Sequence, residues 1–152
     1  MKPPKTKELL LEFCKAFVAD RKQQILENIA RIEESLLSEG KSTAGDKHHT
    51  GRAMLQLDRE NAGKQLQEIE KLETLLGKID ITRSSDRVAL GSLVVTPSDR
   101  YFLSISAGVH SKGGLNTYCI SPGTPIGRLL LGKKQGDTVV FREKEIQIVE
   151  VY

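Results

Sequence analysis

One stretch decides the fold of the C-terminal half of this chain: Thr124-Pro125-Ile126-Gly127-Arg128-Leu129-Leu130-Leu131-Gly132-Lys133-Lys134. Thr124 can cap a helix, and Pro125 suits the first helical position, where no N–H is needed. Gly132 suits the left-handed conformation just beyond a helix end. The next residues, Gln135-Gly136-Asp137-Thr138, indicate a Gly-Asp turn into a strand. The stretch therefore predicts a short capped helix over residues 125–131, followed by a strand.

The sequence around this helix is typical of β-structure. Runs rich in β-branched and aromatic residues predict strands over 88–96, 101–107, 115–120, 138–142 and 145–151. Pro97-Ser98-Asp99 and Lys112-Gly113-Gly114 are turn signals between them, and we interpret His110 as a surface residue beside the second turn. Four aromatic residues are expected in the sheet core or at its edge: Phe102, Tyr118, Phe141 and Tyr152.

The N-terminal half has a helical pattern instead. Residues 5–39 contain no Gly or Pro, and their apolar seam steps by four, three and four: Ile25, Ile29, Ile32 and Leu36. A polar break follows at residues 40–45, and the pattern returns over 46–78 with apolar residues seven apart: Leu55, Ala62, Ile69 and Leu76. Two helices of similar length should pack as an antiparallel hairpin, with arms about 45 Å long. Gly63 lies inside the second arm, and one interpretation is that it allows the first arm to approach closely.

These patterns predict an α+β protein. Residues 1–80 form an antiparallel helical hairpin (a coiled coil), residues 81–86 a polar linker, and residues 87–152 a small, mostly antiparallel sheet domain with one short helix across it.

Composition narrows the class of protein. The chain has 152 residues and a net charge of +3. Residues 1–80 hold 14 Lys/Arg and 14 Asp/Glu, whereas residues 81–152 hold 9 and 6, so the excess lies in the sheet domain. No segment reaches the roughly 20 apolar residues of a membrane span, and no secretory apolar region follows Met1-Lys2-Pro3-Pro4. We expect a soluble cytoplasmic protein whose two cysteines, Cys14 and Cys119, are reduced structural thiols in different domains.

The capped helix resembles a motif of the Gre transcript-cleavage factors. The family motif is close to Ser-Pro-Ile-Gly-Arg-Ala-Leu-Leu-Gly-Lys followed by a Gly-Asp turn, and it matches Pro125–Lys133 and Gly136-Asp137 here. Residues 90–94 (LGSLV) are similar to the family's opening strand, and the order of a hairpin before an FKBP-like sheet domain is also the family's. This sequence departs from the pattern by inserting Gly123-Thr124 after Ser121-Pro122.

The resemblance implies a transcription elongation regulator. It would bind bacterial RNA polymerase, together with the nascent RNA and DNA of the elongation complex, and insert its hairpin into the secondary channel. Two acidic residues at a Gre tip help hold a second magnesium ion at the polymerase's active centre, which then hydrolyses the RNA of a backtracked complex. The residues that the resemblance assigns to polymerase docking are Pro125, Ile126, Gly127, Arg128 and Lys133.

The tip departs from the family. The first tip acid corresponds to Asp46, but the second corresponds to His49, and imidazole is a poor magnesium ligand. Lys41, Lys47 and Arg52 outnumber Asp46 there, so the tip is cationic and suited to RNA phosphate or polymerase carboxylates, as is Arg59 further along. Two mechanisms stay open. The protein either stimulates cleavage through Asp46, or occupies the channel without efficient cleavage, which the loss of the second acid narrowly favours.

Several other interpretations stay open beside these. Asp46 can also serve as the N-cap of the second helix. His48-His49 has no evident third ligand, so we expect no intrinsic metal site, and no catalytic constellation is present, so we expect no enzyme and no tightly bound cofactor. The rival function is an FKBP-like peptide-binding or chaperone module. We expect a monomer, the alternative being a dimer in which the seam pairs between chains.

Overall fold

The computed structural model describes residues 3–41 and 49–152. They form two compact units, a helical unit of Val18–Glu73 and a sheet unit of Met1–Phe17 with Thr74–Tyr152. These units differ from the predicted division into residues 1–80, 81–86 and 87–152. The reason is that the first turns of the N-terminal helix and the end of the second helix group with the sheet.

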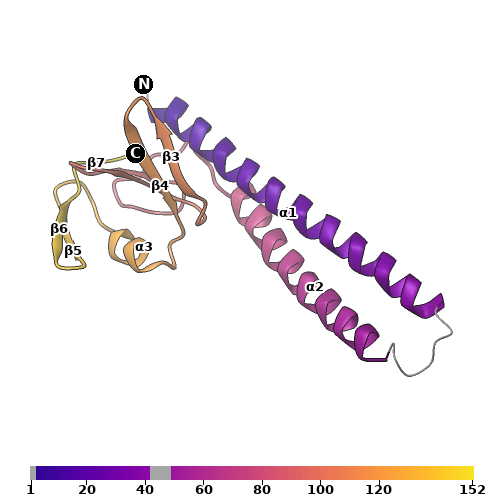
Figure 1. Cartoon of the computed structure of the whole chain (residues 1–152). Coiled ribbons are helices and arrows are strands. Elements are labelled where there is room, and N and C mark those ends of the chain that lie inside the picture. Colours follow the sequence, from indigo (N-terminus) through magenta and orange to yellow (C-terminus); the bar gives the residue numbers. More distant parts are fainter. Residues whose placement is uncertain (1–2, 42–48) are drawn as a thin grey trace. The chain divides into compact units, whose positions relative to one another are not determined.

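The helical unit consists of the larger parts of two antiparallel helices, α1 (Pro3–Lys41) and α2 (His49–Gly77) (Figure 1). Ile29, Ile32 and Ala62 are buried between them. Four partly buried apolar residues pack against this cluster: Ile25, Leu36, Leu55 and Leu66. The predicted seam is therefore the one that packs within this chain, and its burial is the main stabilising contribution to the helix pair.

Polar pairs join the two helices beside the seam. Lys22 Nζ lies 2.9 Å from Glu73 Oε1, and Arg59 Nε lies 3.1 Å from Glu33 Oε1. Because these pairs are solvent-exposed, water and salt screen them, and each contributes little to the stability of the hairpin. They set which faces of the helices meet more than they stabilise the hairpin.

The small residue at the helix contact is Ala62 and not Gly63. Ala62 is 2% exposed, whereas a Cβ added to Gly63 would meet only Arg59 Nη1, from its own helix, at 3.3 Å. The interpretation that Gly63 admits the first arm is therefore wrong. Neighbouring residues on a helix point about 100° apart, so only one of the two can face the partner helix.

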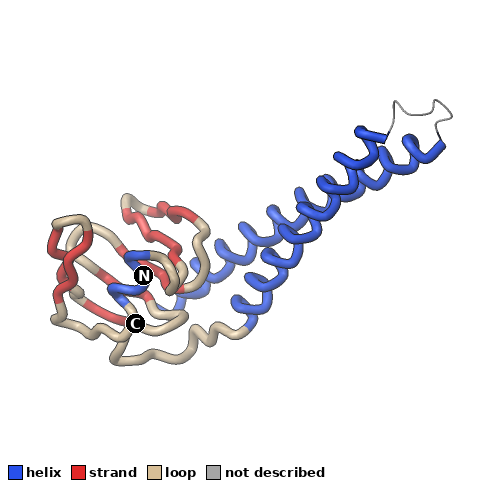
Figure 2. Tube along the Cα trace, turned by 90° about the horizontal axis from the view of Figure 1, so that it is seen from below, coloured by secondary structure: helices blue, strands red, loops and turns tan. Residues whose placement is uncertain are grey.

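The sheet unit contains a five-stranded mixed sheet with the strand order β3-β4-β2-β1-β7. Its strands are β1 (Leu93–Val95), β2 (Arg100–Leu103), β3 (Gly108–Lys112), β4 (Leu115–Ile120) and β7 (Glu150–Val151). A separate pair is formed by β5 (Thr138–Phe141) and β6 (Lys144–Gln147), and α3 (Pro125–Leu130) is the short helix of the unit (Figure 2). Among the strands of the described residues, β2 and β4 alone pair in parallel, so the predicted mostly antiparallel sheet is confirmed.

Four strands differ clearly from the prediction, and one of them, β2, ends at Leu103 rather than at residue 107. The first starts only at Leu93 because Gly91 turns the chain with a φ of +89°. The last divides into β6 and β7 because the N–H of Ile148 between them bonds to Asp137. β3 was missed, although the Gly113-Gly114 pair between two polar-apolar runs is a hairpin signature that could have revealed it.

The five-stranded sheet buries side chains on both faces. On one face, Val94 and Leu103 join a core with Leu130 of α3 and Val139 of β5. On the other, the first turns of α1 pack against β2, β3 and β4: Cys14 contacts Ser104, and the ring of Phe13 meets that of His110 at 5.1 Å. His110 is thus half-buried rather than a simple surface residue.

The expected linker is held to the same helix. Lys7 is 3% exposed, and its Nζ donates a hydrogen bond to the carbonyl oxygen of Arg83 at 3.3 Å. Asp80 accepts from the backbone N–H of Thr82 at 3.0 Å and turns the chain where α2 has ended. The segment 81–86 is therefore anchored to α1 within the sheet unit.

Two neighbouring substitutions should have opposite effects on the helical unit. Ala62→Leu overpacks the seam and should lower the free energy of unfolding by about 1–3 kcal/mol. Gly63→Ala should raise it by roughly 0.5–1 kcal/mol, because alanine favours the helix and only the flexible end of Arg59 must move. Urea unfolding followed by circular dichroism measures both changes. Equal destabilisation by the two variants would contradict the assignment of Ala62 to the contact.

Candidate functional site

Two of the predicted tip residues, Lys41 and His49, lie at the ends of the two helices. Asp46 and Lys47 are outside the described residues, and so is the proposed N-cap role of Asp46. Lys41 ends α1 and His49 begins α2. The backbone of α1 and α2 thus brings the segments that flank the tip to the same end of the hairpin (Figure 1).

The two predicted basic contacts further along both bond across the hairpin. Arg52 Nη1 donates to the carbonyl oxygen of Leu36 at 3.2 Å, and Arg59 pairs with Glu33. These bonds are solvent-exposed, so the guanidinium groups remain accessible while being positioned by α1. A partner would meet two oriented cations on this stretch of α2 rather than freely moving side chains.

Helix α3 has the N-cap and the N-terminal proline that its sequence predicts. Thr124 Oγ1 accepts from the N–H of Gly127 at 3.2 Å and donates to the carbonyl oxygen of Ser121 at 2.7 Å. Pro125 occupies the first turn, and Leu130 is fully buried in the sheet core. The cap and the apolar anchor together fix the helix on the sheet.

Gly127 is required by a close approach of backbone. A Cβ at this position would lie 2.2 Å from the carbonyl oxygen of Ser121 and 3.1 Å from Cα of Pro122. The inserted Gly123-Thr124 is therefore part of a tight loop that folds back onto the helix, with Thr124 as the cap itself. The glycine of the motif is explained by this packing alone.

The residues after α3 form a hydrogen-bonded turn. Gly132 and Gly136 have φ angles of +81° and +92°, which favour glycine. Asp137 Oδ2 accepts from the N–H of Lys134 at 2.9 Å, and its carbonyl oxygen accepts from Ile148 at 2.8 Å. The Gly-Asp element is thus explained by the turn into β5.

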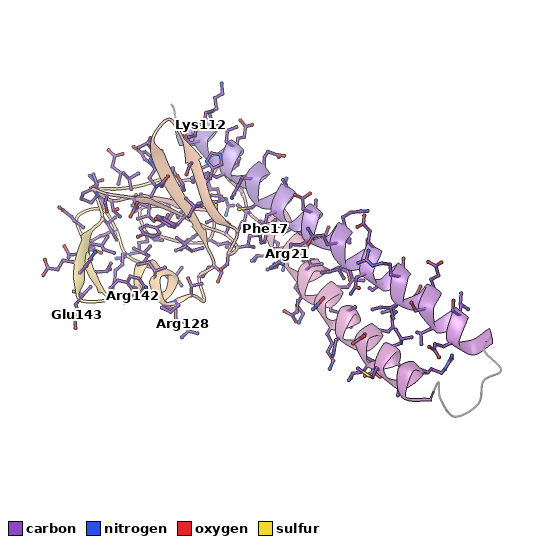
Figure 3. The ribbon with its side chains drawn as sticks, viewed as in Figure 1. Phe17, Arg21, Lys112, Arg128, Arg142 and Glu143 are labelled. Carbon is purple, nitrogen blue, oxygen red and sulfur yellow. The ribbon has the colours of Figure 1, made fainter. Side chains whose placement is uncertain are left out.

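The cations of this motif face outward. Arg128 (labelled in Figure 3), Lys133 and Lys134 are exposed, and within the described parts of the chain none of them forms an ion pair. Pro125 is exposed beside them, Ile126 is half-buried, and Gly127 is buried. Of the predicted docking residues, the geometry therefore leaves Pro125, Arg128 and Lys133 for direct contact with a partner.

The two thiols lie together, although the sequence pattern assigned them to different domains. Cys14 is in the part of α1 that packs on the sheet, and Cys119 is in β4; both are buried and free. A hydrogen bond from Cys119, helped by one from Ser104, lowers the pKa of Cys14 to about 7 despite burial. Contact with Cys14 and burial raise the pKa of Cys119. Sequence reasoning missed this pair because nothing local links position 14 to position 119.

Neither a metal cluster nor a membrane helix is found among the described residues. In residues 3–41 and 49–152, no three His, Cys, Asp or Glu side chains are grouped so as to hold a metal ion. Across the same ranges, no helix combines the length and apolar character needed to span a bilayer.

Comparisons with known proteins give a distant structural similarity. No protein-family model and no curated protein matches it. Among solved structures, it is similar to one titled "Structure of the transcription factor Gfh1", with a TM-score of 0.33 and 17% sequence identity over 87% of this chain and 93% of that one. At this level of likeness, the function has to be argued from the chain's own residues.

Gly127→Ala should be strongly destabilising. The new methyl group would overlap a backbone oxygen that cannot move without breaking the cap of α3, so a loss of about 3 kcal/mol or more is expected. Gly123→Ala is the matched control, because its Cβ would meet only Ser121 Oγ at 3.8 Å. Thermal and urea unfolding compare the two, and equal stability would disprove the close approach.

The two thiols should ionise at widely different pH values, Cys14 first and Cys119 at a much higher pH. Because the pKa of Cys14 lies below the ordinary 9.0, the free energy of unfolding should rise with pH between about 7 and 9. Because the pKa of Cys119 lies above 9.0, this free energy should fall as the pH rises further. Ultraviolet thiolate absorbance should show one ionised thiol in the native chain at pH 9.

Two variants at position 119 test the cause of the lowered pKa. Cys119→Ser keeps a donor for the Cys14 thiolate, whereas Cys119→Ala removes it and should raise the pKa of Cys14. Identical titration of Cys14 in both variants would show that the hydrogen bond is unimportant.

Proposed function

We propose that this chain is a Gre-type regulator of transcription that binds RNA polymerase. The observation that carries the proposal is the joint occurrence, in one chain, of a long antiparallel helical hairpin and the capped α3 motif that resembles the Gre motif. Neither feature is specific alone, because helical hairpins occur in many proteins. Their order along the chain is the one that the Gre resemblance implies.

The sheet unit is the proposed docking element. Thr124, Gly127 and Asp137 have structural reasons to be present, so what the motif offers a partner is its outward cations. Arg128 and Lys133 are exposed and unpaired within the described residues, and they suit an acidic surface of the polymerase. This unit also contains the excess positive charge of the chain.

The hairpin is proposed to act by occupying the secondary channel without efficient cleavage. Only Asp46 remains of the two tip acids, and His49 stands where the second acid is expected. One carboxylate holds a second magnesium ion less firmly than two, since magnesium prefers hard oxygen ligands. Arg52 and Arg59 add positive charge on the same arm, which favours RNA phosphate. On this proposal the chain has no active site of its own, and any magnesium ion belongs to the polymerase.

Charge reversal on the docking surface should weaken binding to RNA polymerase. The variant Arg128→Glu with Lys133→Glu places like charges opposite the expected acidic patch, and its affinity should fall by about tenfold or more in a pull-down or titration with purified polymerase. Arg142→Glu with Lys144→Glu makes the same charge change at exposed positions of the β5–β6 hairpin (Figure 3) and should bind normally. Failure of the wild-type chain to bind polymerase, with retention of unfolded peptides instead, would favour the peptide-binding function.

A backtracked elongation complex separates the two mechanisms. The wild-type chain should slow elongation and release few short 3′ RNA fragments. Rapid fragment release that is abolished by Asp46→Ala would overturn the non-cleaving mechanism while leaving polymerase binding intact. His49→Glu, which restores the second acid, should increase cleavage if the tip reaches the active centre.

A further inference from the structure

A cavity of about 230 Å³ lies in the sheet unit, between the first turns of α1 and one face of β2, β3 and β4. Its apolar wall includes Leu9 and Leu10 from the helix and Leu115 from β4. Three basic residues complete the lining: Arg100, His110 and Lys112. The cavity belongs neither to the helical hairpin nor to the α3 motif.

Strand register explains why three bases meet here. His110 of β3 and Arg100 of β2 both pair with Thr117 of β4, one from each side. Lys112 pairs with Leu115, two residues along β4 from Thr117, and therefore on the same face. The three basic residues therefore share one face of the sheet, with Arg100 and His110 on either side of Thr117 and Lys112 beside Leu115.

Nothing in the described structure neutralises this patch. No Asp or Glu lines the cavity, and within residues 3–41 and 49–152 neither Arg100 nor Lys112 forms an ion pair. The ring of His110 is oriented by its edge-on contact with Phe13 of α1, with centroids 5.1 Å apart. Arg100 and His110 are half-buried, whereas Lys112 is exposed near the end of the β3–β4 hairpin (Figure 3).

We propose that this cavity binds a small organic anion, with an apolar body against the leucines and a carboxylate or phosphate held by the three bases. Uncompensated cations beside a partly buried apolar wall favour such a ligand over a neutral one, because charge-assisted hydrogen bonds strengthen away from water. The volume is below the roughly 300–1,000 Å³ of sites for drug-sized molecules, so the body is about the size of one aromatic ring. Binding would join α1 to the sheet and stabilise the sheet unit.

The proposal is tested by calorimetric titration of the full chain with four probes. Phenyl phosphate and benzoate carry both the ring and the anion, benzamide lacks the charge, and inorganic phosphate lacks the ring. We expect at least one of the first two to bind with a Kd of about 1 mM or tighter, and about tenfold more tightly than benzamide and inorganic phosphate. Comparison of phenyl phosphate with benzoate identifies which anionic group the site prefers.

Variants assign the binding to this cavity. Arg100→Gln should lower the affinity for the better-binding probe by about tenfold. Lys112→Gln, at an exposed position where the substitution leaves the sheet folded, should lower it by about threefold. Arg142→Gln removes a cation elsewhere in the same unit and should leave the affinity unchanged. The proposal is overturned if neither ring-bearing anion binds, if benzamide or inorganic phosphate binds equally well, or if Lys112→Gln and Arg142→Gln behave alike.

Discussion

The packing of the first turns of α1 against the sheet is the contact on which the rest of the structure depends. A five-stranded sheet with apolar side chains on both faces needs two covers. Helix α3 and the β5–β6 pair cover one face, and α1 covers the other. Leu10 and Cys14 are almost fully buried there, and Phe102 and Cys119, partners in register, lie on that side of the sheet. Without α1, this face would be exposed to water.

This contact also explains features that appear unrelated along the chain. It brings Cys14 beside Cys119, so that Cys119 lowers the pKa of Cys14 and Cys14 raises the pKa of Cys119. It places the leucines of α1 over the bases of β2 and β3, which creates the cavity. It anchors the segment after α2 through the buried Lys7. A single helix–sheet contact thus positions the thiol pair, the basic pocket and the segment that follows α2, all within the sheet unit.

The α3 motif illustrates how fold and recognition share one short stretch. Its cap, its buried leucine, its closely approached glycine and its turn aspartate all serve the fold. The side chains of Arg128, Lys133 and Lys134 take part in none of these contacts and remain exposed. In this motif, the uncharged positions and Asp137 define the structural element, and the basic side chains remain available to a partner. The proposed polymerase docking therefore depends on residues that contribute little to stability.

Local sequence determined much of this protein. The period of the apolar residues predicted both hairpin helices and their seam, and Thr124, Pro125 and Gly132 predicted a capped helix within one residue of α3. The departure of His49 from the expected tip acid is also a property of sequence alone. These features were predictable because each depends on residues within a few positions of one another.

The features that depend on contacts between residues distant in sequence were decided by the tertiary structure. The parallel pairing of β2 with β4, the assignment of the start of α1 to the sheet, and the role of Ala62 rather than Gly63 at the helix contact follow from packing across the chain. Two further features also depend on packing: Cys14 lies beside Cys119, and the same cavity is lined by Arg100, His110 and Lys112. Strand order and register bring these residues together, and no local sequence pattern encodes the order or the register.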